Sequence, residues 1–211
     1  MNAVTDSFSW PFGDPGWAGK ILVQGLIAII PIVGWIALAG WLLMIIDNFR
    51  AGRKELPPAG FHLERGIWIF LVLVIYSIVF SIPSGIIRGS AAASDSDALR
   101  ALGGLVGFAL SLFLAFLTPA IILFAYRGGF AGGFDFNGIW QLVTSNITNT
   151  VLAGLMIVVA DVIGACGVIL CCVGLIFTIP YGVAITAGVV TWYEKVMGSP
   201  SPAAPPPPAP A

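Results

Sequence analysis

Residues 21–46 constrain the fold of this chain more than any other segment, because Gln24 is the only strongly polar side chain in 26 consecutive residues. An apolar run of 18 or more residues is typical of a helix that crosses a membrane. The composition agrees, since 58% of the residues are hydrophobic and 9% are charged, against roughly 25% charged residues in soluble domains. The sequence therefore predicts an integral membrane protein.

The apolar region around this segment is too long for one crossing. Asp14-Pro15 is typical of a helix start, and one helix over residues 15–52 would be about 57 Å long at about 1.5 Å per residue. The hydrocarbon core of a bilayer is only about 30 Å thick. Pro31 and Gly34 both disfavour a continuous helix between them. The two interpretations are a tight hairpin of residues 15–30 and 35–49, or one kinked helix over residues 20–46.

A second apolar region, residues 150–193, contains Asp161 as its only charge and also exceeds one crossing. It needs two spans with a turn between Gly164 and Gly174. We therefore expect one all-α domain over residues 1–198, a polytopic transmembrane bundle of six helices, or of five if the kinked helix replaces the hairpin. The six expected spans are residues 15–30, 35–49, 66–87, 102–126, 148–168 and 173–196.

Two segments are expected outside the bundle. Apolar and polar side chains of residues 134–145 fall largely on opposite helical faces, which predicts a short interfacial helix. Residues 199–211 contain only Ser, Pro and Ala, a composition that predicts a disordered, polyproline-biased tail. The N-terminus lacks the features of a signal peptide, so the first apolar stretch is expected to be retained.

The basic residues predict the orientation. With six spans, both termini and the connectors after Phe49 and Tyr126 lie on one side, which then holds seven of the nine Lys and Arg residues. Only Arg88 and Arg100 lie opposite, whereas five spans give six against three. The positive-inside rule therefore places both termini of this multi-pass protein in the cytoplasm.

Several ordered landmarks resemble a known family. They are residues 10–17 (WPFGDPGW) followed by Lys20, residues 30–34 (IPIVG) with 39–41 (AGW), Leu56-Pro57 before Gly66, and residues 177–181 (FTIPY). In this order they resemble the domain of unknown function 4013 family of prokaryotic membrane proteins, over nearly all of the chain except the tail. The resemblance implies the inner membrane of a bacterium or archaeon, and it implies no activity because none is assigned to the family.

Asp161 is the first candidate for a functional site, because an ionisable group at membrane depth is costly and marks function by default. If the turn begins at Gly164, however, Asp161 lies solvated at the outer interface. Two further sets are candidates. Thr178, Pro180 and Tyr181 would expose backbone carbonyls of a broken helix to a ligand or form a kink packed inside the bundle, and Arg50, Arg53 and Lys54 would contact anionic headgroups in addition to setting the topology.

The sequence contains no recognisable catalytic pattern, such as a nucleophile with its base, paired carboxylates or a phosphate-binding glycine loop. Three clustered cysteines, Cys166, Cys171 and Cys172, with the single His62 far away in sequence, have no zinc-site spacing. We therefore expect no enzyme activity, no cofactor and no metal site. The net charge of −1 is unfavourable for nucleic-acid binding.

Two classes of function remain. The first is a transport or lipid-handling membrane protein whose partners are membrane lipids. The alternative is a structural or assembly partner in a complex with other membrane proteins. Polar residues that converge on one cavity inside the bundle favour the first class, and a bundle packed dry, with polar residues only at its rims, favours the second.

Overall fold

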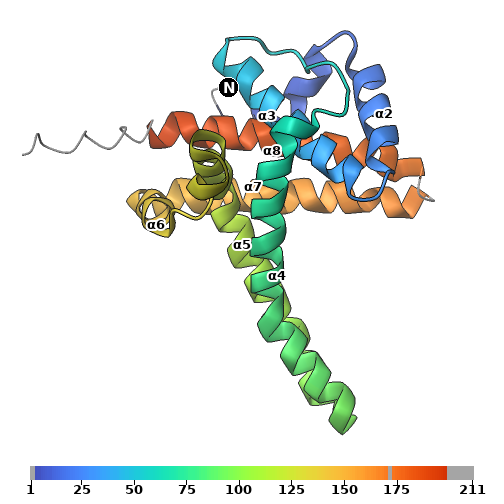
Figure 1. The fold of residues 1–211 in the computed structure, drawn as a ribbon, viewed down its shortest axis with the longest axis vertical. Coiled ribbons are helices and arrows are strands. Elements are labelled where there is room, and N and C mark those ends of the chain that lie inside the picture. Colours follow the sequence, from blue (N-terminus) through green and yellow to red (C-terminus); the bar gives the residue numbers. More distant parts are fainter. Residues whose placement is uncertain (1–2, 171–172, 199–211) are drawn as a thin grey trace, which may run out of the picture.

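The computed structural model describes residues 3–170 and 173–198, which are mainly helical and contain no strand. The predicted all-α class is confirmed (Figure 1). In chain order the elements are α1 (Asp6–Ser9), the 3-10 helix η1 (Trp10–Gly13), α2 (Trp17–Ala28), α3 (Val33–Arg50), α4 (Leu63–Ser94), α5 (Asp97–Gly132), α6 (Phe136–Ser145), α7 (Ile147–Cys166), the 3-10 helix η2 (Gly167–Leu170) and α8 (Val173–Met197).

The chain turns back between α2 and α3, in the segment where Pro31 and Gly34 predict a break. Gly34 makes this turn tight, since a Cβ atom built there would lie 2.3 Å from the carbonyl oxygen of Ile27. The alternative of one kinked helix over residues 20–46 is therefore wrong. However, α2 has only 12 residues, about 18 Å at 1.5 Å per residue, which is too short to cross a hydrocarbon core of about 30 Å.

Five helical segments of the described chain are long and apolar enough to cross a membrane, one fewer than the six expected spans. They are Val33–Arg50, Leu63–Ser94, Asp97–Gly132, Ile147–Ile169 and Gly174–Met197, with Trp17–Ala28 as a shorter apolar helix. The difference arises at α2, which covers Trp17–Ala28 instead of the expected residues 15–30 and has too few residues for a crossing.

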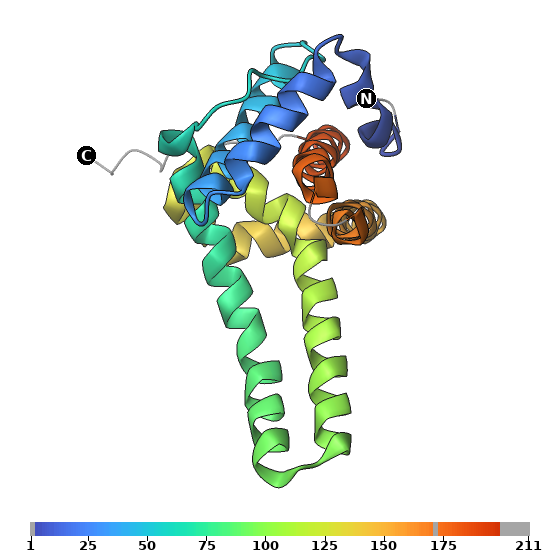
Figure 2. The ribbon, with the colours of Figure 1, turned by 90° about the vertical axis from the view of Figure 1, so that its right-hand side faces the viewer.

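Helices α4 and α5 form a long antiparallel hairpin that projects from the rest of the molecule (Figure 2). They contain 32 and 36 residues, so both extend beyond the expected spans 66–87 and 102–126. At the tip, Arg100 pairs with Asp95 at 2.6 Å and with Asp97 at 2.8 Å. We call this hairpin the arm.

Helices α7 and α8 lie side by side and run across the arm (Figures 1 and 2). The two helix pairs therefore do not share one direction, and they cannot both follow a single membrane normal. The turn expected between Gly164 and Gly174 begins after Cys166, where η2 replaces α7. Cys171, Cys172 and the expected tail, residues 199–211, lie outside the described residues.

The expected amphipathic segment forms α6. The Asp135 carboxylate caps this helix by accepting a hydrogen bond from Gly138 N at 3.0 Å. Ile139 and Leu142 are buried, whereas Trp140 is 56% exposed. The helix thus has one face against the bundle and one face open, but Trp140, which the sequence pattern assigns to the apolar face, lies on the open side.

Candidate functional site

A cavity of about 850 Å³ lies along the arm, bounded by α3, α4, α5, α7 and α8. Most of its walls are apolar, with Leu42, Phe70, Phe80, Phe108 and Ile122 among the lining residues. We call it the arm cavity. Its walls resemble those of small-molecule sites, which are mainly hydrophobic with a few polar groups that fix the orientation of the ligand.

A stripe of polar side chains follows one wall of the arm cavity. On α4 the stripe consists of Ser77, Ser81, Ser84 and Arg88, whose spacings of four, three and four residues place them on one helical face. Each serine hydroxyl donates to a carbonyl of its own helix at 2.8–3.0 Å. Because these protons are engaged within α4, the hydroxyl oxygens remain as acceptors along an otherwise apolar wall.

Helix α5 faces this stripe with small and hydroxylated residues, of which Gly107, Ser111 and Thr118 line the same cavity. Gly103 and Gly107 leave room for Arg88. A Cβ atom built at Gly103 would lie 2.8 Å from Arg88 Cγ, and one at Gly107 would lie 3.5 Å from Arg88 Nη2. The Arg88 side chain therefore lies along the glycine-lined surface of α5.

Arg88 and Asp161 are the two charged residues that line the arm cavity. Within residues 3–170 and 173–198 neither side chain has a hydrogen bond or an ion pair, and both are exposed. Helix α7 continues past Asp161 to Cys166, so the turn begins later than Gly164. The structure thus brings one predicted site residue, Asp161, to a cavity that it shares with an unpredicted cation.

Thr178, Pro180 and Tyr181 do not line the arm cavity. The Thr178 hydroxyl donates to Gly164 O at 2.8 Å and ties α8 to α7. The Tyr181 hydroxyl donates to Phe8 O at 2.6 Å and holds the N-terminal segment. Both side chains are therefore engaged in contacts within the protein.

Pro180 lies inside α8, which continues without a break on both sides of it. Proline lacks the N–H that would bond to the carbonyl four residues earlier, here that of Ile176. Gly25 of α2 covers this carbonyl so closely that a Cβ atom at Gly25 would lie 1.7 Å from Ile176 O. The freed carbonyl thus faces a neighbouring helix rather than a cavity, which is the packed-kink alternative.

The third predicted set, Arg50, Arg53 and Lys54, lies at the C-terminal end of α3 and in the connector that follows it. Arg50 donates from Nε (3.1 Å) and Nη2 to Glu194, and its guanidinium lies 4.1 Å from the centre of the Tyr126 ring. Arg127 donates to the same carboxylate at 2.6 Å. Asp47 accepts from Arg65 and from the Tyr126 hydroxyl. These contacts join α3, α4, α5 and α8 and gather three of the basic residues that the sequence assigns to one side.

Arg53 and Lys54 are placed differently from Arg50. Arg53 donates from Nε (3.1 Å) and Nη2 (2.7 Å) to Asn48 Oδ1. Lys54 has no hydrogen bond or ion pair with another residue of the described chain. Arg50 and Lys54 line a second, smaller cavity, whereas Arg53 does not.

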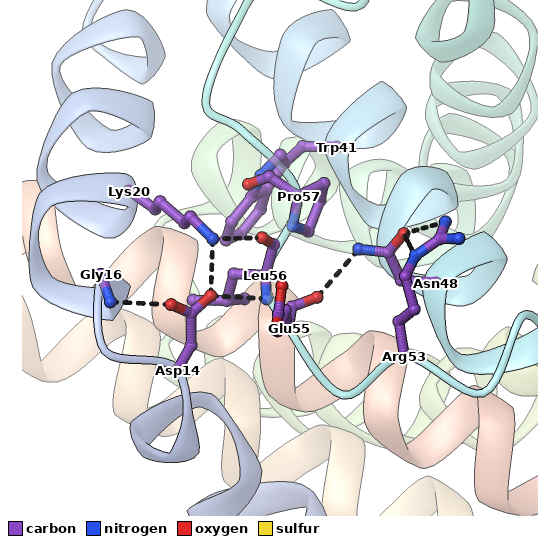
Figure 3. A network of polar contacts seen from close by, with 9 residues as sticks. All are labelled: Asp14, Gly16, Lys20, Trp41, Asn48, Arg53, Glu55, Leu56 and Pro57. Carbon is purple, nitrogen blue, oxygen red and sulfur yellow. Dashed lines mark hydrogen bonds and ion pairs between the residues drawn. The ribbon is translucent and has the colours of Figure 1, made fainter.

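A buried ion pair that sequence reasoning missed fastens the connector after α3 to the start of α2 (Figure 3). The Asp14 side chain is 4% exposed, and it accepts from Gly16 N at 2.7 Å, Lys20 Nζ at 2.6 Å and Leu56 N at 2.9 Å. Lys20 also donates to Leu56 O at 2.6 Å. The sequence predicted a helix start at Asp14-Pro15, but α2 begins at Trp17 after Gly16, without a side-chain cap.

The pKa of Asp14 lies below its usual value because two opposing effects do not cancel. Burial alone would raise this pKa, since it penalises the charged carboxylate. The hydrogen bonds from Lys20, Gly16 and Leu56, together with the positive charge of Lys20, outweigh burial and lower it. The carboxylate therefore stays ionised at neutral pH.

Further hydrogen bonds hold the same connector. Trp41 Nε1 donates to Pro57 O at 3.3 Å, and Asn48 Nδ2 donates to Glu55 O at 2.9 Å. Gln24 Oε1 accepts from Gly60 N at 3.0 Å. This bond explains the one strongly polar side chain of residues 21–46, because fully buried Gln24 satisfies the backbone of the connector.

Groups of three or more His, Cys, Asp or Glu residues that would hold a metal ion are absent from the part of the chain that the structure describes. Cys166 is a free, exposed thiol at the end of α7. The chemistry of the site therefore rests on the apolar walls, hydroxyl groups and two charges of the arm cavity.

The part of the chain that the structure describes is all-α and has five helices of membrane-spanning length around a largely apolar cavity, which are features of a polytopic helical membrane protein. The chain matches the family model described as protein of unknown function (DUF4013) over residues 23–174, more than half of its length, and belongs to that family. The match leaves out residues 10–17 and 177–181, which contributed to the resemblance. No curated protein and no solved structure matches the chain.

Proposed function

We propose that this protein is a non-enzymatic membrane protein that binds an amphipathic, phosphate-bearing lipid in the arm cavity, as part of lipid handling or transport. The observation that carries the proposal is a cavity with apolar walls and two opposite charges, Arg88 and Asp161, neither of which has a partner among residues 3–170 and 173–198. A bundle packed dry, as expected for a purely structural protein, would have no such cavity.

Each part of the cavity suits one part of a lipid. Phe70, Phe80 and Phe108 offer apolar surface to an acyl chain. The Arg88 guanidinium forms charge-assisted hydrogen bonds with a phosphate group. The Asp161 carboxylate attracts an amine where the headgroup carries one, and the Ser77 and Ser81 oxygens accept hydrogen bonds from glycerol or amine groups.

We also propose that both termini lie in the cytoplasm, in the inner membrane of a prokaryote. Support comes from the contacts of Asp14 and Lys20 with Leu56, because they hold the start of α2 beside the connector that follows α3. The N-terminus then lies on the same side as that connector, however deeply α2 enters the bilayer. The basic cluster of Arg50, Arg65 and Arg127 supports the assignment of this side to the cytoplasm.

Lipid binding by the purified protein tests the proposal. Native mass spectrometry or a fluorescent-lipid titration compares wild type with Arg88→Gln and Asp161→Asn. A lost charge-assisted hydrogen bond costs about 1.5–3 kcal/mol, so Arg88→Gln should weaken binding roughly 10- to 100-fold. Asp161→Asn should weaken only the binding of amine-bearing lipids.

Arg100→Gln is the matched control, since Arg100 lies at the tip of the arm, pairs with Asp95 and Asp97, and does not line the cavity. The lipid affinity of the Arg100→Gln variant should equal that of wild type. A folded Arg88→Gln variant that retains wild-type affinity, or a wild-type protein that binds no lipid saturably, would contradict the proposal.

A second candidate function is a structural or assembly role in a membrane complex. It is favoured by the arm, which projects from the other helices (Figure 2) and exposes Ile82, Ile86, Leu105 and Phe108. A partner helix packed on the arm would cover these side chains. Under this alternative, mild-detergent extracts should contain a complex that is lost on Leu105→Ser and retained on Arg88→Gln.

A further inference from the structure

The second cavity lies at the C-terminal ends of α3 and α8 and has a volume of about 370 Å³. Its polar lining includes Arg50, Lys54, Glu194 and Lys195, and its aromatic lining is Phe49 and Trp192. We call it the rim cavity. None of these residues lines the arm cavity.

Local backbone structure places Lys54 beside the end of α3. Helix α3 ends at Arg50, and Gly52 follows with φ of 75°, a conformation that favours glycine. Arg53 N donates to Asn48 O at 2.8 Å and Gly52 N donates to Phe49 O at 3.0 Å, the bond pattern of a Schellman motif. This motif reverses the chain, so that Lys54 lines a cavity together with the last residues of the helix that precedes it.

The rim cavity carries an excess of positive charge. Both oxygens of its one lining carboxylate, Glu194, accept hydrogen bonds from Arg50, and Arg127 shares Oε1. Lys54 and Lys195 add two further cations to the lining. Other acidic groups lie nearby: Asp47 binds Arg65 and Tyr126, and Glu55 is the exposed neighbour of Lys54 in the connector.

The place of this cavity in the fold indicates what it binds. Trp192 and Phe49 lie at the ends of helices long and apolar enough to cross a membrane, where aromatic residues commonly mark the headgroup level. Basic pockets between membrane helices on the cytoplasmic side bind phosphate-bearing headgroups. The ion pairs with Glu194 and the ring of Tyr126 hold Arg50 in one position.

We propose that the rim cavity binds the phosphate of an anionic membrane lipid through Lys54 and Lys195, beside the fixed guanidinium of Arg50. This site is independent of lipid binding in the arm cavity. Of the three residues predicted to contact headgroups, the site keeps Arg50 and Lys54 and leaves out Arg53. It adds Lys195.

The test measures binding of phosphatidylglycerol and of neutral phosphatidylcholine to the protein by native mass spectrometry, in the Arg88→Gln background so that the arm cavity contributes little. Each cation near a membrane surface contributes about 1 kcal/mol, which corresponds to about fivefold in affinity. Lys54→Gln and Lys195→Gln should each weaken phosphatidylglycerol binding about fivefold, and the double variant about 25-fold. Phosphatidylcholine binding should be weaker and unchanged by either substitution.

Arg53→Gln is the matched control, because it removes the same charge one residue away without changing the cavity lining. An equal loss in Arg53→Gln and Lys54→Gln would show that only the surface charge of the connector matters, and would overturn the site. Equal binding of the two lipids would also overturn it. Saturable binding of inorganic phosphate at similar concentrations, lost in Lys54→Gln, would overturn the assignment to a lipid.

Discussion

Asp14→Asn should destabilise the protein although it changes only one atom of the side chain. Asp14 accepts three hydrogen bonds with a side chain that is 4% exposed. An asparagine keeps one acceptor, which suits Gly16 N, and places an NH₂ group against two donors, Lys20 Nζ and Leu56 N. The connector would lose the hydrogen bond from Leu56 N to Asp14. Its bonds to Lys20 and Gln24 of α2 are not removed by the substitution.

The magnitude follows from the burial of the two partners. Removing one partner of a buried ion pair costs about 3–5 kcal/mol, but the Lys20 side chain is 29% exposed and recovers part of its hydration. We therefore expect a loss of about 2–4 kcal/mol in the free energy of unfolding. Denaturant titration in detergent, followed by tryptophan fluorescence, measures this loss.

Asp95→Asn provides the control. Asp95 also pairs with an arginine, at 2.6 Å, but its side chain is 91% exposed, and such surface pairs contribute about 0–1 kcal/mol. A change below about 0.5 kcal/mol in Asp14→Asn, or equal changes in the two variants, would refute the reasoning from burial.

The same carboxylate predicts a pH dependence. Because the pKa of Asp14 is lower in the folded than in the unfolded protein, its contribution to stability is complete above the unfolded pKa of about 3.9 and is lost as the pH falls through the folded pKa. The stability difference between wild type and Asp14→Asn should be constant from about pH 5 to 8 and shrink below about pH 4. A constant difference down to pH 2 would contradict this assignment.

Two further predictions concern packing and topology. Gly25→Ala should destabilise the protein by about 1–3 kcal/mol, since the new methyl group overlaps Ile176 O. Gly19→Ala in the same helix meets no atom within 4 Å and should be neutral or stabilising. Thermal unfolding in detergent compares the two variants, and equal effects would exclude the close contact at Gly25. Reporter fusions at Gly52, Ser94, Gly133 and Ser199 should report cytoplasm, outside, cytoplasm and cytoplasm, and a fusion before Asp14 should report cytoplasm; an outside signal there would contradict the topology.

Local sequence patterns predicted only part of the candidate site. Asp161 stands out in sequence because it is the only charge in a long apolar region, and it does line the arm cavity. Thr178, Pro180 and Tyr181 stand out for an equally good local reason, yet Gly164, Gly25 and Phe8 engage them. Whether an unusual residue serves a ligand or a neighbouring helix depends on contacts distant in sequence.

Arg88 is the converse case, a residue that lines the arm cavity but was not predicted as a site residue. Its spacing from Ser77, Ser81 and Ser84 is a helical pattern that is visible in the sequence, so a search for a polar stripe on α4 would have found it. The sequence does not show that this stripe faces Gly103 and Gly107 of α5, nor that Asp161 borders the same cavity. The positive-inside count instead treats Arg88 as a topology signal alone.

The sequence by itself determined the helical class, the family and the turn at Pro31, because long apolar runs and helix breakers act within a few residues of themselves. Only the tertiary structure decided that α2 stays short, that Asp14 and Lys20 hold the connector at Leu56, and that the arm crosses α7 and α8. These features depend on which surfaces meet across the chain. Packing of close glycine contacts and pairing of buried charges select those surfaces, and neither leaves a periodic signal in the sequence.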